Sequence, residues 1–267
     1  MNSATAASLK ALLNEDELFV MPCCHDALSA RLIERAGFKM TFMSGFAVSA
    51  TRLAMPDTGL ISFGEMVDQL RSITQAVSFP VLADGDTGYG NALNVKRTVR
   101  EYAAAGAACV MIEDQVWPKR CGHTKGKQIV SFDEACSRIK AAVDARDEGA
   151  DILIMARTDA RAIAGMEEAV KRMRACAEIG ADILFLEAPQ TVEEMEQFCR
   201  QVGGLKMANL IEDGLTPVLP PEELRRIGTI SNTSERSSAS RATTMRKRVT
   251  RTPDGSGLRS RGLRHIR

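Results

Sequence analysis

The sequence has few of the residues that mark common metal, redox and membrane proteins. Histidine occurs three times, aromatic residues make up 4% of the 267 positions, and no apolar run is long enough to cross a bilayer. The seven cysteines show no CxxC spacing, which argues against zinc sites and disulfide frameworks and indicates reduced thiols. The first residues also lack the apolar core of a signal peptide. We therefore expect a cytoplasmic protein with no membrane partner.

Seven short apolar runs are present, and longer segments of helical period separate them. The runs are LFVMPCC (18–24), KMTFMSG (39–45), PVLADGD (80–86), CVMIEDQ (109–115), ILIMARTD (152–159), ILFLEAP (183–189) and KMANLIE (206–212). Strands that read as nearly continuous apolar runs are buried on both faces, as in a parallel sheet covered by helices. No GxGxxG follows the first run. The sequence therefore predicts an α/β fold, a (β/α)8 TIM barrel in one domain, rather than a dinucleotide-binding sheet.

Polar residues follow six of these runs, at the point where each predicted strand ends. The clusters are Ser44-Gly45, Asp84-Gly85-Asp86, Glu113-Asp114, Arg157-Thr158-Asp159, Glu187 and Asn209. The carboxyl ends of barrel strands converge on one face, where active sites are built. Each cluster alone could simply mark the start of a solvated loop. Taken together, several carboxylates beside an arginine favour a common site.

The carboxylates among these residues indicate a metal. Asp84 and Asp86 are alternate residues leaving one strand, and Glu113 ends the next strand. Ligation by oxygen alone suits a hard cation, and Mg²⁺ typically takes one or two carboxylates and keeps waters. We predict Mg²⁺, with Mn²⁺ nearly as suitable. The alternative is that the glycine-rich DGDTGYG is a flexible turn.

A long basic loop, EDQVWPKRCGHTKGK, follows the fourth run and contains Cys121. Long loops at the active face of a barrel often act as lids. Lys119, Arg120 and His123 lie close to Cys121 in sequence, and positive charge favours a thiolate, which can exchange a proton near neutral pH. An incidental cysteine in a solvated basic loop is an equally good interpretation of this stretch alone.

KRCGH resembles the K-[KR]-C-G-H signature of the isocitrate lyase and phosphoenolpyruvate mutase superfamily. MSGFAVSATRLAMPDTGL, LADGDTGYGN, MIEDQ, ARTDA, FLEAP and ANLIEDGLTPVLPPEEL resemble superfamily motifs in the same order, over residues 10–228. The resemblance implies a Mg²⁺-dependent barrel that acts on small α-oxo or 2-hydroxy carboxylates, and a homotetramer. Because the phosphonomutases lack the loop cysteine, Cys121 favours the carbon–carbon lyase branch. Within that branch the chain resembles the short enzymes, methylisocitrate lyase, 2,3-dimethylmalate lyase and oxaloacetate hydrolase, more than the much longer isocitrate lyases. Phosphonopyruvate chemistry is the alternative.

The resemblance also implies roles for individual residues in cleaving a 2-hydroxy di- or tricarboxylate. Cys121 would protonate the departing fragment, Asp57 or a metal-bound water would take the hydroxyl proton, and Arg157 would neutralise the oxyanion. Substrate-binding groups would be Ser44, Gly45, Lys119, Gly122, His123, Glu187 and Asn209, and metal ligands would be Asp84, Asp86 and Glu113.

The last part of the chain departs from this resemblance. Residues 229–267 contain ten Lys or Arg and two acids, a net charge of +8, which leaves −7 on residues 1–228. We expect a barrel domain over 1–228 that lacks a normal eighth β/α unit, followed by a disordered basic tail. A change of reading frame would also explain the tail, and an inactive family member is a further alternative. No folded recognition motif accompanies the basic residues, so we expect no nucleic-acid partner.

Overall fold

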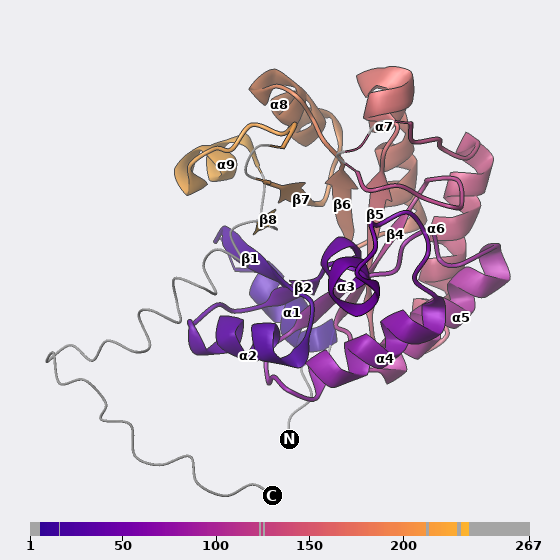
Figure 1. Ribbon diagram of the computed structural model, residues 1–267. Helices are drawn as coiled ribbons and strands as arrows, with labels where there is room; N and C mark the ends of the chain where they lie inside the picture. The colour runs from indigo at the N-terminus through magenta and orange to yellow at the C-terminus, as the bar shows by residue number, and fades with distance from the viewer. Residues whose placement is uncertain are drawn as a thin grey trace, which may run out of the picture.

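The computed structural model describes residues 6–15, 17–122, 124, 126–211, 214–228 and 231–234. Eight parallel strands, each paired with the next and the last with the first, close into a barrel (Figure 1). They are β1 (Phe19–Cys24), β2 (Thr41–Met43), β3 (Val81–Asp84), β4 (Cys109–Glu113), β5 (Leu153–Thr158), β6 (Ile183–Leu186), β7 (Leu205–Asn209) and β8 (Ser231–Ser234). The seven apolar runs form β1 to β7, so the predicted TIM barrel is confirmed.

Helices surround the barrel and connect its strands (Figure 1). Those described are α1 (Ala6–Leu13), α2 (Ala27–Arg35), α3 (Gly45–Leu53), α4 (Phe63–Thr74), α5 (Ala92–Ala104), α6 (Phe132–Asp147), α7 (Arg161–Ile179), α8 (Val192–Gln201) and α9 (Pro221–Ile227). Several begin at a side-chain cap: Ser62, for example, accepts a hydrogen bond from the Glu65 N–H. Among the described helices, none is long and apolar enough to cross a membrane.

Alternation along the strands divides the apolar core into an inner and an outer part. On β4, Cys109 and Met111 belong to the cluster inside the barrel, whereas Val110 and Ile112 belong to the cluster under the helices. Leu9 and Leu13 of α1 join the inner cluster, so α1 covers the amino-terminal end of the barrel. The carboxyl ends of the strands are therefore the end where loops can build a site.

Strand β8 corrects one prediction from the sequence. The run Ser-Asn-Thr-Ser, expected not to form a strand, pairs with β1 from Phe19 to Pro22 and with β7 from Met207 to Asn209. A ladder is made by backbone N–H and C=O groups, which these polar residues have, and β1 and β7 would otherwise expose unpaired edges. The barrel thus extends past the predicted boundary at Gly228. Residues 235–267, for which we predict disorder, lie outside the described residues. A helix that followed β8 would lie there too.

Candidate active site

A small pocket at the carboxyl ends of the strands contains eight of the predicted site residues. Its lining is Phe46, Asp57, Asp84, Lys119, Cys121, Gly122, Arg157, Glu187 and Asn209. Asp86 and Glu113 form ion pairs with pocket residues, and Ser44 and Gly45 begin α3 beside Phe46. The predicted His123 lies outside the described residues.

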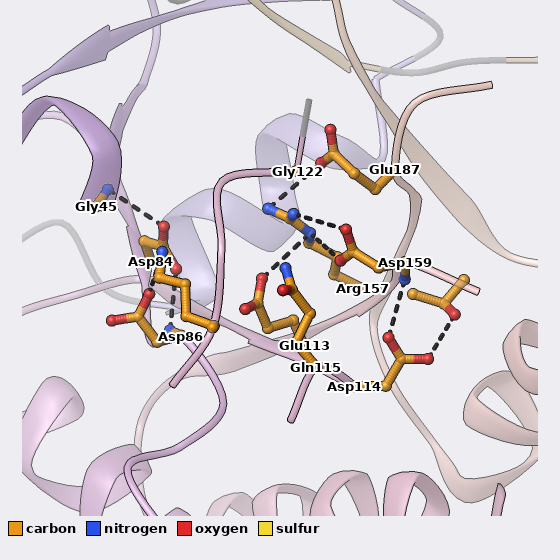
Figure 2. Close-up of polar contacts among 12 residues, drawn as sticks. Gly45, Asp84, Asp86, Glu113, Asp114, Gln115, Gly122, Arg157, Asp159 and Glu187 are labelled. Carbon is orange, nitrogen blue, oxygen red and sulfur yellow. Dashed lines mark hydrogen bonds and ion pairs between the residues drawn. The ribbon is translucent and has the colours of Figure 1, made fainter. Parts of the chain in front are cut away.

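Asp84 ends β3 beside the first turn of α3 (Figure 2). Its Oδ2 accepts a hydrogen bond from the Gly45 N–H at 3.2 Å, and its Oδ1 accepts one from the Asp86 N–H at 2.9 Å. A Cβ at position 45 would lie 2.6 Å from Asp84 Oδ2, so the close approach of α3 requires glycine. Burial and then the negative charge of Asp86 raise the pKa of Asp84 to about 7.

Ser44 and Gly45 make local contacts in this structure. Ser44 Oγ accepts a hydrogen bond from the Ala47 N–H as the N-cap of α3, while the Gly45 N–H donates to Asp84. Their predicted contact with a substrate carboxylate stays a prediction.

Lys119 is a buried cation between two carboxylates. Its Nζ lies 2.7 Å from Asp57 Oδ2 and 2.7 Å from Asp86 Oδ1. Burial lowers the pKa of Lys119, but the charges of Asp86 and the neighbouring carboxylates outweigh it and raise that pKa well above its ordinary value. Asp57 Oδ1 is buried and accepts no hydrogen bond from the described residues. Burial also raises the pKa of Asp57, so this oxygen is suited to accept a proton.

Arg157 on β5 joins the carboxylate that ends β4 to the carboxylate that follows β6 (Figure 2). Its Nε lies 3.4 Å from Glu113 Oε2 on β4, and its Nη1 lies 3.3 Å from Glu187 Oε2 after β6. It also donates to Asp159 from Nε at 2.9 Å and from Nη2 at 3.2 Å. Burial lowers the pKa of Arg157, but these carboxylates raise it to a value well above the ordinary one. The guanidinium therefore stays charged inside the pocket.

The loop between β4 and α6 brings Cys121 to the pocket. A β-bridge between Gln115 and Ile129 closes its base, and the Gln115 side chain binds the backbone N–H and C=O of Arg120 at 3.0 and 2.9 Å. The Cys121 N–H donates to the Asp57 C=O at 3.2 Å. Cys121 is partly exposed, in contrast to the buried Cys109. Its thiolate character stays a prediction.

Sequence reasoning missed the roles of Lys127 and Asp159. Asp159 Oδ1 lies 2.6 Å from Lys127 Nζ, and the same ammonium group donates to the Gly122 C=O. Asp159 was visible in the polar cluster after β5, and that position was the signal that could have identified it. Lys127 had no such signal, because a lysine in a glycine-bearing loop is ordinarily solvated.

The groups in and beneath the pocket include more carboxyl groups than cations. The carboxyl groups include Asp57, Asp84, Asp86, Glu113, Asp159 and Glu187, and the cations include Lys119, Lys127 and Arg157. Glu113 Oε1 is buried and accepts no hydrogen bond from any residue that the structure describes. Burial raises the pKa of Glu113 well above its ordinary value. Such an excess of buried carboxylates is costly unless a cation compensates it.

An all-oxygen donor set of this kind fits Mg²⁺. The described Asp, Glu, His and Cys side chains include no group of three that converges tightly enough to hold an ion by itself. That arrangement is compatible with Mg²⁺, which usually keeps several water ligands and takes only one or two carboxylates directly.

Comparisons with known proteins decide the family. The family model for phosphoenolpyruvate phosphomutase matches residues 9–250. This chain belongs to that family. It is 48% identical to 2,3-dimethylmalate lyase of Eubacterium barkeri, over 84% of this chain and 77% of the relative. It is 44% identical to 2-methylisocitrate lyase of Aeropyrum pernix, over 82% of this chain and 70% of the relative.

A solved structure of oxaloacetate acetylhydrolase with the inhibitor 3,3-difluorooxalacetate is also similar. Its TM-score is 0.85 at 36% identity, and the match covers 94% of this chain and 89% of the other. The predicted superfamily is confirmed, and so is the predicted enzyme class, a carbon–carbon lyase of this family.

Proposed function

We propose that this family member is a Mg²⁺-dependent lyase that cleaves a 2-hydroxy di- or tricarboxylate of the 2,3-dimethylmalate or 2-methylisocitrate type. The products would be an α-oxo acid such as pyruvate and a second carboxylate. One observation carries the proposal: Cys121 and Asp57, a candidate acid and a candidate base, line the same small pocket as Asp84 and Arg157. Both proton transfers can therefore act on one bound molecule.

Asp84, Asp86 and Glu113 would hold the Mg²⁺, or Mn²⁺ in its place. The excess of buried carboxylates around Asp84 supports this assignment. When bound, the cation polarises the hydroxyl and carboxylate oxygens of the substrate.

The proposed proton transfers use Asp57 and Cys121, which line the same pocket. Asp57 Oδ1 accepts the proton of the substrate hydroxyl. As that oxygen becomes a carbonyl, the adjacent carbon–carbon bond breaks and its electron pair leaves with the second fragment. The Cys121 thiol then donates a proton to the carbon that received the pair. Arg157 stabilises the developing negative charge, and losing one such donor typically costs about 3 kcal/mol in the activation barrier.

The lining of the pocket favours a dicarboxylate with an alkyl branch. Lys119 and Arg157 are the cations of this lining within the described residues, and carboxylates of the protein already pair with both. Phe46 adds an apolar surface and is 45% exposed. A third substrate carboxylate would have to share these already paired cations, whereas a methyl group needs no cation. We therefore place 2,3-dimethylmalate ahead of 2-methylisocitrate.

The second candidate is hydrolysis of the carbon–carbon bond of oxaloacetate. It is favoured by the similarity to the oxaloacetate acetylhydrolase structure, whose TM-score is 0.85. Phosphonopyruvate cleavage within the same fold is a third possibility, and release of inorganic phosphate from phosphonopyruvate would distinguish it.

Calorimetric titration of oxalate, which mimics the enolate of pyruvate, tests whether the site assembles. We expect binding in the presence of Mg²⁺, no binding in EDTA, and no binding to Asp84→Ala. Asp68→Ala is the matched control, because Asp68 is an exposed partner of Arg52 and should leave binding unchanged. Folded protein that binds no oxalate with Mg²⁺ would contradict the proposal and favour an inactive family member.

A substrate panel then separates the candidate reactions. It contains 2,3-dimethylmalate, 2-methylisocitrate, oxaloacetate and phosphonopyruvate, with pyruvate, acetate or phosphate as the measured product. Cys121→Ser should lower the rate of carbon–carbon cleavage by about 100-fold or more, the usual contribution of one general acid. A homotetramer and a cytoplasmic location remain part of the proposal, and light scattering of the purified protein tests the first.

A further inference from the structure

Two buried lysines attach the Cys121 loop to the barrel, and of these two Lys119 lines the pocket. The second is Lys127, six residues after Cys121 in the sequence, with a side chain that is 3% exposed. Its Nζ lies 2.6 Å from Asp159 Oδ1 and also donates to the Gly122 C=O. A buried lysine is costly without such partners, so these contacts determine where the loop can lie.

The contact with Gly122 fixes the backbone directly after Cys121. A Cβ at position 122 would lie 2.4 Å from Arg157 Nη2 and 2.4 Å from Glu187 Cδ. The Gly122 backbone therefore lies directly against the ion pair between Arg157 and Glu187, as the close-up shows (Figure 2). Any displacement of Gly122 would move the neighbouring thiol relative to the guanidinium.

Asp159 links the loop to Arg157 because it binds both cations. It accepts two hydrogen bonds from Arg157, at 2.9 and 3.2 Å, and it receives Lys127 on the same carboxylate. The Asp159 N–H is in turn held by Asp114 Oδ1 at 2.9 Å, so the carboxylate projects from a fixed backbone. One rigid group thus orients an arginine of the pocket and the loop that carries the cysteine.

We propose that Lys127 is a positioning residue. It attaches the turn at Cys121 and Gly122 to Asp159 and so fixes the position of the Cys121 thiol relative to the Arg157 guanidinium. The inference deepens the proposed function, on which it rests for the role of Cys121 as proton donor. The tether itself is a property of the folded chain and can be measured without a substrate.

Hydrogen–deuterium exchange of the full chain tests the tether. The informative amides are Cys121, which donates to the Asp57 C=O, and Thr124, which donates to the Cys121 C=O. In Lys127→Met we expect these amides to exchange roughly tenfold faster, which corresponds to about 1.4 kcal/mol in the opening of the loop. Exchange in β5 should keep its wild-type rate, since global destabilisation would accelerate both regions.

Three further variants make the exchange experiment decisive. Lys127→Arg keeps the charge and should stay close to the wild-type rate, whereas Lys127→Gln keeps a donor without the charge and should be intermediate. Lys140→Met is the matched control, because Lys140 is an exposed lysine paired with Asp144. Wild-type exchange at Cys121 and Thr124 in both Lys127→Met and Lys127→Gln would overturn the proposal, as would equal acceleration in β5.

Kinetics supply the second measurement once a substrate is known. Because the tether positions the proton-donating thiol and Lys127 does not line the pocket, Lys127→Met should lower kcat by a larger factor than it raises KM. An effect confined to KM would contradict the positioning role. If no substrate of the panel reacts, the proposed function is wrong. The exchange experiment still tests the Lys127 tether, because it needs no substrate.

Discussion

Asp159 shows how much a single buried side chain can hold together at this site. Burial raises the pKa of its carboxyl, but the charges of Arg157 and Lys127 and their hydrogen bonds outweigh burial, and the net pKa is lowered. A carboxyl whose pKa is lowered on folding stabilises the protein above the unfolded pKa. That stabilisation disappears as the pH falls through the lower, folded value.

Asp159→Asn should therefore destabilise the protein at neutral pH and much less in acid. At pH 7 we expect a loss of about 3–5 kcal/mol, the usual result of breaking one side of a buried ion pair. The difference between wild type and variant should shrink below about pH 4, because the Asp159 carboxyl of the unfolded wild type then takes up a proton that the folded protein does not bind. Urea denaturation at several pH values measures it, with Asp144→Asn at the surface as the control. A difference that does not change with pH would contradict this account.

At position 122 the structure has no room for a side chain. In Gly122→Ala the new Cβ would overlap Arg157 Nη2 and Glu187 Cδ, each 2.4 Å away, so either the loop or the guanidinium must move. A misplacement of about 1 Å at a reacting centre can cost roughly 100-fold in rate. We expect a loss of that size in kcat/KM with little change in the melting temperature. Gly64→Ala, where a Cβ meets nothing within 4 Å, should keep full activity.

At the scale of elements, the strands differ in how well they can be predicted from the sequence. β1 to β7 were predictable because a strand buried on both faces must be apolar, and the residue types record that requirement. β8 is made of Ser, Asn and Thr, and its place depends on the free edges of β1 and β7, which a local pattern does not contain. The Cys121 loop is similar: its cysteine was visible, but its attachment through Lys127 depends on Asp159, which is 32 residues away.

Strand β8 can be tested by a change to its backbone. Thr233 pairs with Met21 of β1 and Asn209 of β7, and Thr233→Pro would remove an N–H from this ladder. We expect the free energy of unfolding to fall by about 2 kcal/mol, because a buried partner is left without its hydrogen bond. Thr233→Ala keeps the N–H and serves as the control. Equal stability of the two variants would show that β8 contributes little to closing the barrel.

At the scale of the whole molecule, the position of the site was predictable and its balance of charge was not. The rule that barrel sites lie at the carboxyl ends of strands located Asp84, Glu113, Arg157 and Glu187 together. How many carboxylates are buried, and which cations meet them, follows from side-chain packing between loops that are distant in sequence. Asp57 and Lys119, 62 residues apart, form such a pair at 2.7 Å.

The end of β8 at Ser234 also separates two parts of the chain with net charges of opposite sign. Residues 229–234 carry no charged side chain, so the chain up to this point has a net charge of −7 and the remainder has +8, although the whole has only +1. The near-neutral total therefore conceals two strongly charged parts. A protein that lost the segment after Ser234 to a protease would migrate toward the anode at neutral pH and bind an anion exchanger. Native electrophoresis would thus report the integrity of this chain.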